Sequence, residues 1–274
     1  MDHYQFWFYM YPTGEPLTFA LADLRDELEE LQLRCDPAGR NRKLDQMVLV
    51  GHSMGGLLSY LMTVDSEDTL WNSVSQVPMA DLQTDPDTAG EIERVFFFES
   101  DSSIDRVVTI ASPFRGSRYA NRFTRWLGRA IVSLPASTMK VTGLVAGLNT
   151  RSGWEKVFTP TTSVDSLARQ SAVLHLVSQT TTPEDVVHNN IVGVSRGRTA
   201  RWWTDGVVTY RSAHRDDVDS ELVVPAGHSQ VHRHERAIEE VRRVLKDHLQ
   251  QLRQQRDIIP VRHTALEAGE SVVR

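Results

Sequence analysis

The sequence predicts an α/β fold with a mostly parallel sheet that is flanked by helices. Short apolar runs typical of buried strands alternate with longer segments of helical periodicity. Apolar residues make up 40% of the 274 residues, which is enough for one sizeable domain with its own core. We expect five strands, at residues 4–11, 46–50, 106–111, 190–194 and 220–224.

Composition and charge exclude several classes of protein. The formal net charge of −6 indicates no basic surface, so we expect no nucleic-acid partner. Cys35 is the only cysteine of the sequence, which excludes an internal disulfide. No apolar run approaches the roughly 18 residues of a membrane span, and the first residues lack the pattern of a signal peptide. As given, we expect a cytoplasmic protein, with membrane association only through its substrate or a longer N-terminus.

The first two elements are expected at residues 4–11 and 17–31. Residues 4–11 are aromatic at both alternating positions, which is typical of a strand that is covered on both faces. Pro12 and Gly14 end this strand. Apolar residues then recur at helical spacing to residue 31, with acidic residues mostly on the other face.

The strand at residues 46–50 leads into the motif that we expect to carry the chemistry. It runs directly into GHSMG at residues 51–55, and the apolar residues that follow predict a buried helix. A Gly-x-Ser-x-Gly turn between a strand and a helix holds its serine, here Ser53, in a strained conformation with the hydroxyl projecting from the sheet. Strand and helix pass so close that the residues two before and two after the serine must be small. The alternative is a glycine-rich turn that contains a serine by chance, which the flanking strand and helix disfavour.

The middle of the chain contains two segments of contrasting composition. Residues 65–103 are polar and rich in turn formers, so we interpret them as a surface excursion that the apolar run at 95–98 anchors. Residues 118–160 are apolar and helix-like. Two interpretations of this insertion stay open, namely ordinary core helices or a cap over a pocket for an acyl group.

The last part of the chain continues the alternation of helices and strands. A helix is expected at residues 167–177, and an amphipathic helix at 238–252 follows the last strand. We therefore expect a single domain at residues 1–253, with 118–160 as a candidate cap, and a weakly ordered tail at 254–274.

Candidate partners for the serine follow the last two expected strands. A serine hydroxyl is a poor nucleophile at neutral pH and needs a base, which in turn needs an orienting acid. Asp205 and His228 come after consecutive strands, and the carboxyl ends of parallel strands meet at one edge of a sheet. His228 is preferred among the histidines because Gly227 and the strand end place it on the first turn of its loop. The rival histidines and acids nearby are His214, His232, His234, Asp216, Asp217 and Asp219.

Four segments resemble the α/β-hydrolase superfamily, and the likeness runs over residues 4–250. They are VLVGHSMGGLLSYLM, RVVTIASPFRGS, TDGVVTYRSAH and ELVVPAGHS. The most similar branch contains lipases, esterases and the GPI inositol-deacylases. The resemblance implies an α/β-hydrolase fold with Ser53 as nucleophile, Asp205 as acid and His228 as base. It also implies that the backbone N–H of Met54 stabilises the oxyanion.

Two departures from that branch matter. Its usual Thr-Pro-His-Arg-Gly-Ser loop has Phe114 in the place of the histidine, and we take Phe114 and His52 as candidate substrate-binding residues. The family fold also has three strands before the one that matches residues 4–11, and the loop after the third supplies a second oxyanion donor. We therefore expect the fold to be incomplete at its N-terminus and the natural protein to be longer there.

The expected function is hydrolysis of carboxylic esters through an acyl-enzyme, without metal or organic cofactor. The apolar residues 118–160 favour a lipid-like or other hydrophobic acyl group. A metal site at His232 and His234 is not expected, because no acidic or cysteine partner has ligand spacing. The alternatives are an acyltransferase, an amidase or thioesterase on the same site, or a binding protein impaired in catalysis because the oxyanion loop is missing.

Overall fold

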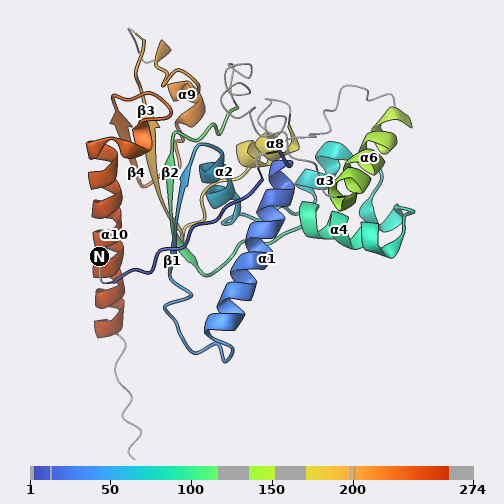
Figure 1. Ribbon diagram of the computed structural model, residues 1–274, viewed down its shortest axis with the longest axis horizontal. Coiled ribbons are helices and arrows are strands. Elements are labelled where there is room, and N and C mark those ends of the chain that lie inside the picture. The colour runs from blue at the N-terminus through green and yellow to red at the C-terminus, as the bar shows by residue number, and fades with distance from the viewer. Residues whose placement is uncertain are drawn as a thin grey trace, which may run out of the picture.

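A four-stranded parallel sheet forms the centre of the molecule. The computed structural model describes residues 3–12, 14–116, 136–151, 171–197, 199 and 202–258. The strands lie in the order β1-β2-β3-β4, and every neighbouring pair is parallel. All four carboxyl ends therefore lie at the same edge, which is the upper edge in Figure 1. The strands are β1 (Met47–His52), β2 (Ile104–Ile110), β3 (Val187–Gly193) and β4 (Ser220–Val224).

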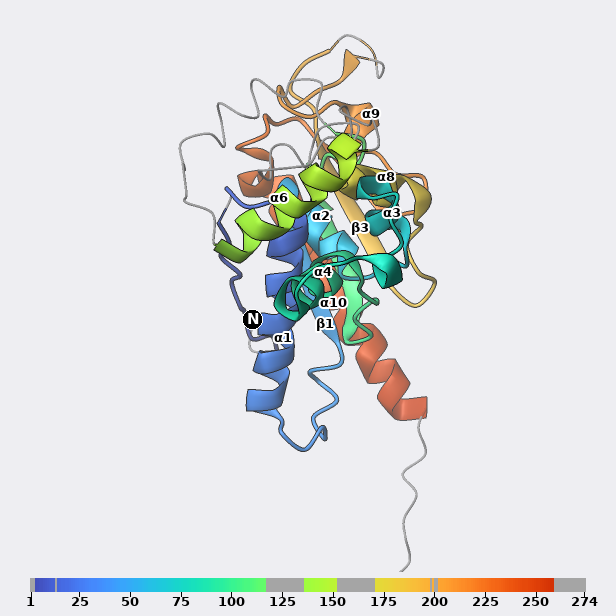
Figure 2. The same ribbon diagram turned by 90° about the vertical axis from the view of Figure 1, so that its right-hand side faces the viewer.

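Helices cover both faces of this sheet. In Figure 1, α10 lies along one face, while α1, α2, α3, α4, α6 and α8 lie on the other side, and Figure 2 is turned toward that side. Neighbouring residues of β2 point to opposite faces, because Val107 belongs to the larger core cluster and Val108 to the cluster beneath α10. The helices are α1 (Leu17–Cys35), α2 (Met54–Leu61), α3 (Thr69–Val74), α4 (Pro86–Phe96), α6 (Ala136–Arg151), α8 (Ala172–Gln179), α9 (Tyr210–Ala213) and α10 (Glu235–Ile258).

The predicted fold class is confirmed, but the first predicted strand is wrong. Residues 4–11 form no strand, and Phe8 and Met10 are each 90% exposed. A strand needs a hydrogen-bonding neighbour, and within the described residues β1 pairs only with β2. Side chains hold the segment instead. The hydroxyl of Tyr4 donates to the carbonyl of Leu245 in α10, and that of Tyr9 donates to the carbonyl of Ala20 in α1.

The interpretation of residues 65–103 as a polar surface excursion is also wrong. This segment contains α3, α4 and a short 3-10 helix, η1 (Met79–Asp81). Asp85 caps α4 by accepting a hydrogen bond from the Thr88 amide at 3.2 Å, and Pro86 occupies the first turn. The buried Ile92, Val95 and Phe96 then follow at helical spacing. Apolar residues spaced for a helix were present among the turn formers, and the run at 95–98 does anchor the segment in the core.

The predicted cap lies only partly within the described residues. Its described part is α6, whose Val141 and Val145 belong to the larger core cluster. Lys140 forms an ion pair with Asp85 at the start of α4. The rest of the segment 118–160 lies outside the described residues, so the cap stays a prediction.

At the other end of the chain, α10 continues to Ile258, past the domain end expected at residue 253. None of the helices in the described ranges is long and apolar enough to cross a membrane.

Candidate active site

Ser53 lies in the sharp turn between β1 and α2. Its backbone has φ 58° and ψ −119°, a conformation that is rare for a residue with a side chain. Such a conformation costs about 1–3 kcal/mol and persists only where the surroundings impose it. Here the Ser53 amide donates to the carbonyl of Ile110 at 2.7 Å, which ties the turn to the end of β2. The turn therefore holds Ser53 at the carboxyl edge of the sheet.

Two of the three nearby glycines are required by close packing of β1 on α2. A Cβ atom at Gly51 would overlap the main chain of Gly55 and Gly56. A Cβ atom at Gly56 would overlap Oγ of Ser112 and lie 3.0 Å from the carbonyl oxygen of Gly51. Among the residues that the structure describes, a Cβ atom at Gly55 would meet only the hydroxyl of Tyr11, at 4.0 Å. The expectation that residue 55 must be small for packing is therefore wrong, and residue 56 carries that constraint.

His228 lies in the loop after β4 and contacts Ser53 directly. Its Nε2 is 2.9 Å from Oγ of Ser53, and its Nδ1 is 2.7 Å from Oδ2 of Asp205. A carboxylate only accepts hydrogen bonds, so Nδ1 carries the proton and Nε2 is left to accept from the serine hydroxyl. All three side chains are buried. The imidazole thus links the serine to the carboxylate in one hydrogen-bonded chain.

Asp205 follows β3 and is held by main-chain donors. Its Oδ1 accepts from the amides of Val207 and Val208, at 2.8 and 2.7 Å. A Cβ atom at Gly193 would lie 3.0 Å from Cβ of Asp205, so this glycine at the end of β3 gives the acid loop room. These two hydrogen bonds fix the orientation of the carboxylate beside His228. The sequence predicted that Ser53, Asp205 and His228 would meet at this edge, and the structure brings all three together.

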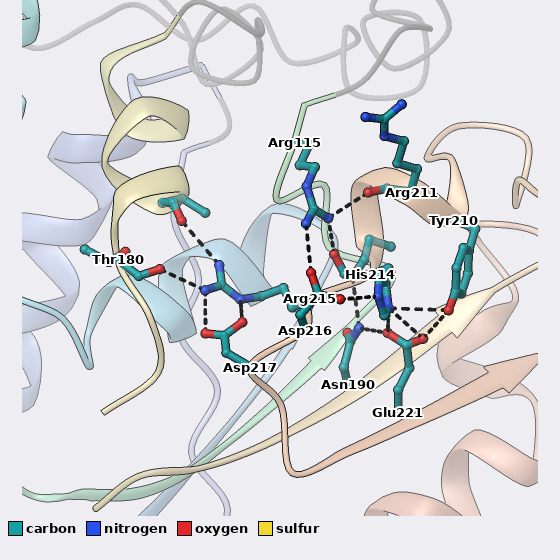
Figure 3. Close-up of polar contacts among 12 residues, drawn as sticks. Arg115, Thr180, Asn190, Tyr210, Arg211, His214, Arg215, Asp216, Asp217 and Glu221 are labelled. Carbon is teal, nitrogen blue, oxygen red and sulfur yellow. Dashed lines mark hydrogen bonds and ion pairs between the residues drawn. The ribbon is translucent and has the colours of Figure 1, made fainter. Parts of the chain in front are cut away.

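The rival acids belong to other clusters, one of which surrounds Arg215 (Figure 3). This buried guanidinium donates to both carboxylate oxygens of Asp217, at 2.8 and 2.7 Å. It also donates to the carbonyl of Thr180 and to the hydroxyl of Tyr60, and it lies 4.2 Å from the centre of the Tyr60 ring. Asp217 is therefore engaged in ion pairing. The sequence analysis missed this cluster, because no spacing connects Arg215 to Tyr60.

His214 lies in a second cluster of the same figure. Its Nδ1 is 2.8 Å from Glu221 in β4, and its Nε2 is 3.0 Å from Asp216. Burial opposes the charged form, but the bonds to Glu221 and Asp216 outweigh it and raise the pKa of His214. Tyr210 and Asn190 also donate to Glu221. The cluster fixes the end of the segment that carries Asp205.

The remaining rivals also have other partners. Asp219 accepts from the amide of His188, and His234 accepts from the amide of Arg236. The ring of His232 packs on that of His52. In the described part of the chain, no rival histidine or acid is hydrogen-bonded to Ser53, and no group of three or more His, Cys, Asp or Glu side chains is placed to hold a metal ion.

Phe114 packs among two aromatic rings and a guanidinium group. Its ring is 2% exposed and meets the rings of Tyr60 and His188 edge-on, at 5.7 and 5.9 Å. The guanidinium of Arg215 lies 5.1 Å above it. An apolar ring fits these partners, which explains the phenylalanine at this position. The expected contact of Phe114 with substrate stays a prediction.

We expect His188 to make the fold sensitive to acid. Burial and the positive charge of Arg215 lower the pKa of His188 to about 3, against about 6.5 in an unfolded chain. Between these values the unfolded state binds a proton that the folded state does not, so stability falls as pH falls below 6.5. The slope is at most about 1.4 kcal/mol per pH unit. Urea unfolding of wild type and His188→Gln at pH 4.5 and 7.5 measures the difference in slope, and equal slopes would contradict the assignment.

The sequence model of the alpha/beta hydrolase family matches residues 11–244. The mature form of Bacillus licheniformis lipase BlEst2 aligns with 14% identity and a TM-score of 0.36, over 80% of this chain and 69% of its own. The metagenomic carboxyl esterase MGS0156 aligns with 18% identity and a TM-score of 0.41, over 80% of this chain and 53% of its own. This chain therefore spans about half the length of that esterase. No curated protein matches it.

Proposed function

The chain belongs to the alpha/beta hydrolase family, and we propose that it is a serine hydrolase that cleaves carboxylic esters through Ser53, His228 and Asp205. The observation that carries this proposal is the continuous chain of hydrogen bonds from the serine hydroxyl through the imidazole to the carboxylate. Its supporting features are the strained backbone of Ser53 and the 2.9 Å contact between Nε2 of His228 and Oγ of Ser53, because both suit a nucleophile paired with a general base.

The reaction proceeds in two stages. Nε2 of His228 takes the proton of Ser53 while Oγ attacks the carbonyl carbon of the ester, and the charge on Asp205 stabilises the imidazolium. The tetrahedral intermediate collapses, the proton passes from His228 to the leaving alcohol, and the acyl group stays on Ser53. Water then attacks the acyl carbon as His228 removes its proton, and the acid leaves as His228 returns that proton to Oγ of Ser53.

The amide of Met54 is the proposed donor to the developing oxyanion. Met54 is the first residue of α2. Amides in the first turn of a helix have no partner within the helix, and the helix dipole places its positive end there. One donor of this kind is worth roughly 2.7–4 kcal/mol, or about 100- to 1000-fold in rate. A lipid-like or other hydrophobic acyl group is the proposed substrate class, on the strength of the apolar sequence at 118–160 alone.

Labelling with a fluorophosphonate probe tests the proposal. We expect the probe to modify wild type at Ser53, as peptide mapping will detect, and to leave Ser53→Ala unmodified. Ser229→Ala is the matched control, since Ser229 is an exposed serine beside His228, and it should label like wild type. A folded wild-type protein that resists the probe would contradict the proposal.

A substrate panel then separates the reaction classes. Nitrophenyl esters of increasing acyl length test the preference for hydrophobic acyl groups, and matched amides and thioesters test the amidase and thioesterase alternatives. Product analysis with added alcohol distinguishes acyl transfer from hydrolysis. Faster turnover of acetyl than of octanoyl esters would contradict the proposed acyl preference.

A further inference from the structure

The residue before the nucleophile contacts the main chain of the base. Nε2 of His52 lies 2.9 Å from the carbonyl oxygen of His228, across 176 residues of sequence. A carbonyl oxygen only accepts hydrogen bonds, so Nε2 of His52 carries a proton and donates the hydrogen bond. We propose that His52 is a positioning residue that fixes the main chain of His228 and so aims its imidazole at Ser53. The inference rests on the proposed serine hydrolase function.

The ring of His52 contacts the rings of two other histidines. Its ring centre lies 5.0 Å from that of His228 and 4.6 Å from that of His232, both at tilted angles. Burial and these neighbours lower the pKa of His52 to about 4. The ring is therefore neutral at pH 7, which leaves one proton for the two ring nitrogens. The contact with His228 assigns that proton to Nε2.

His52 completes a set of bonds that hold both polar groups of the His228 main chain. The His228 amide donates to the carbonyl of Asp205 at 3.0 Å, while its carbonyl accepts from His52. The end of β1 with its turn and the segment after β3 therefore each meet His228 twice, once at its main chain and once at its ring. Asp205 binds the amide and Nδ1, whereas His52 and the adjacent Ser53 bind the carbonyl and Nε2.

This geometry assigns His52 a role different from substrate binding. Its Nε2 already donates to His228, and its ring contacts two imidazoles. If the donor is lost, the carbonyl of His228 loses its bond to His52, and both short bonds of the imidazole depend on the placement of this main chain. Displacement of a reacting group by about 1 Å can cost about 100-fold in rate. A positioning residue therefore affects kcat more than KM.

Three variants separate positioning from the alternatives. His52→Phe keeps a ring and removes the donor, whereas His52→Gln places an amide N–H where Nε2 lies. His232→Phe is the matched control, because it changes the other neighbour of His52 and leaves the bond to His228. With a nitrophenyl ester, we expect His52→Phe to lower kcat about 10- to 100-fold with KM within about twofold. His52→Gln should recover most of this loss, and His232→Phe should stay near wild type.

Two kinetic results would overturn the assignment. A raised KM with kcat intact in His52→Phe would mean that the ring binds substrate. An equal loss of kcat in His52→Gln and His52→Phe would mean that ring packing, and not the donor, matters. Thermal unfolding of each variant shows whether any loss reflects the fold.

A measurement independent of turnover keeps this proposal separate from the proposed function. Proton NMR of protein with 15N-labelled histidine observes the Nδ1 proton that His228 shares with Asp205. We expect this proton to stay protected from exchange in wild type and His52→Gln and to exchange faster in His52→Phe. Unchanged exchange in His52→Phe would overturn the positioning role even in an active enzyme. A wild-type protein that neither hydrolyses esters nor reacts with fluorophosphonate would overturn the function, while the NMR result would still decide the role of His52.

Discussion

Replacement of Asp205 by asparagine is expected to lower kcat for ester hydrolysis by about four orders of magnitude in a protein that remains folded. The reason lies in the two amides of Val207 and Val208 that donate to Oδ1. An asparagine must keep its amide oxygen facing these donors, so its NH2 group faces Nδ1 of His228. The imidazole then accepts at Nδ1 and carries its proton on Nε2, where it can no longer take the proton of Ser53.

The matched control for this variant is Asp216→Asn. Asp216 also bonds to a histidine, His214, but its side chain is 87% exposed, and exposed pairs contribute only about 0–1 kcal/mol. We expect kcat of Asp216→Asn to stay within about twofold of wild type. Stopped-flow or steady-state kinetics on one nitrophenyl ester, with thermal unfolding of both variants, provide the test. Retention of a tenth of the activity by Asp205→Asn would exclude it as the orienting acid.

The edge of the sheet where the site forms could be predicted because parallel strands impose it. Buried strands of such a sheet are continuous apolar runs, and four of the five predicted runs are strands. Once these were recognised, Ser53, Asp205 and His228 had to lie at the same edge. The wrong prediction of a strand at residues 4–11 also comes from the use of apolar runs. An apolar run predicts burial on both faces, but a strand also needs hydrogen bonds to a neighbouring strand, and residues 4–11 make none with β1.

The contacts that refine the site could not be predicted from the sequence. The bond from His52 to the main chain of His228 joins residues 176 positions apart, and it depends on the orientation of one ring. The stacking of Arg215 on Tyr60 likewise leaves no periodic signal. Residue patterns report which faces are buried, because burial repeats along an element. They do not report which single donor meets which carbonyl group across two loops.

Replacement of Gly51 by alanine is expected to destabilise the fold by more than about 3 kcal/mol, which lowers Tm by roughly 6 °C or more. The added Cβ would overlap main-chain atoms of Gly55 and Gly56, and these cannot move unless the end of β1 separates from α2. That separation would also release the strained turn at Ser53. Thermal and urea unfolding measure the loss, and fluorophosphonate labelling reports whether Ser53 keeps its reactivity.

Two neighbouring glycines supply graded controls for this close approach. The Cβ of Gly56→Ala meets the side chain of Ser112, which can rotate, and the carbonyl of Gly51 at 3.0 Å. Its loss of stability should therefore be intermediate. The Cβ of Gly55→Ala meets the hydroxyl of Tyr11 at 4.0 Å and nothing closer in the described part of the chain. Alanine also favours a helix over glycine by about 1 kcal/mol. We therefore expect stability to increase in the order Gly51→Ala, Gly56→Ala, Gly55→Ala. Equal losses at residues 51 and 55 would contradict the close packing of β1 on α2, and with it the constraint that holds Ser53 in its strained turn.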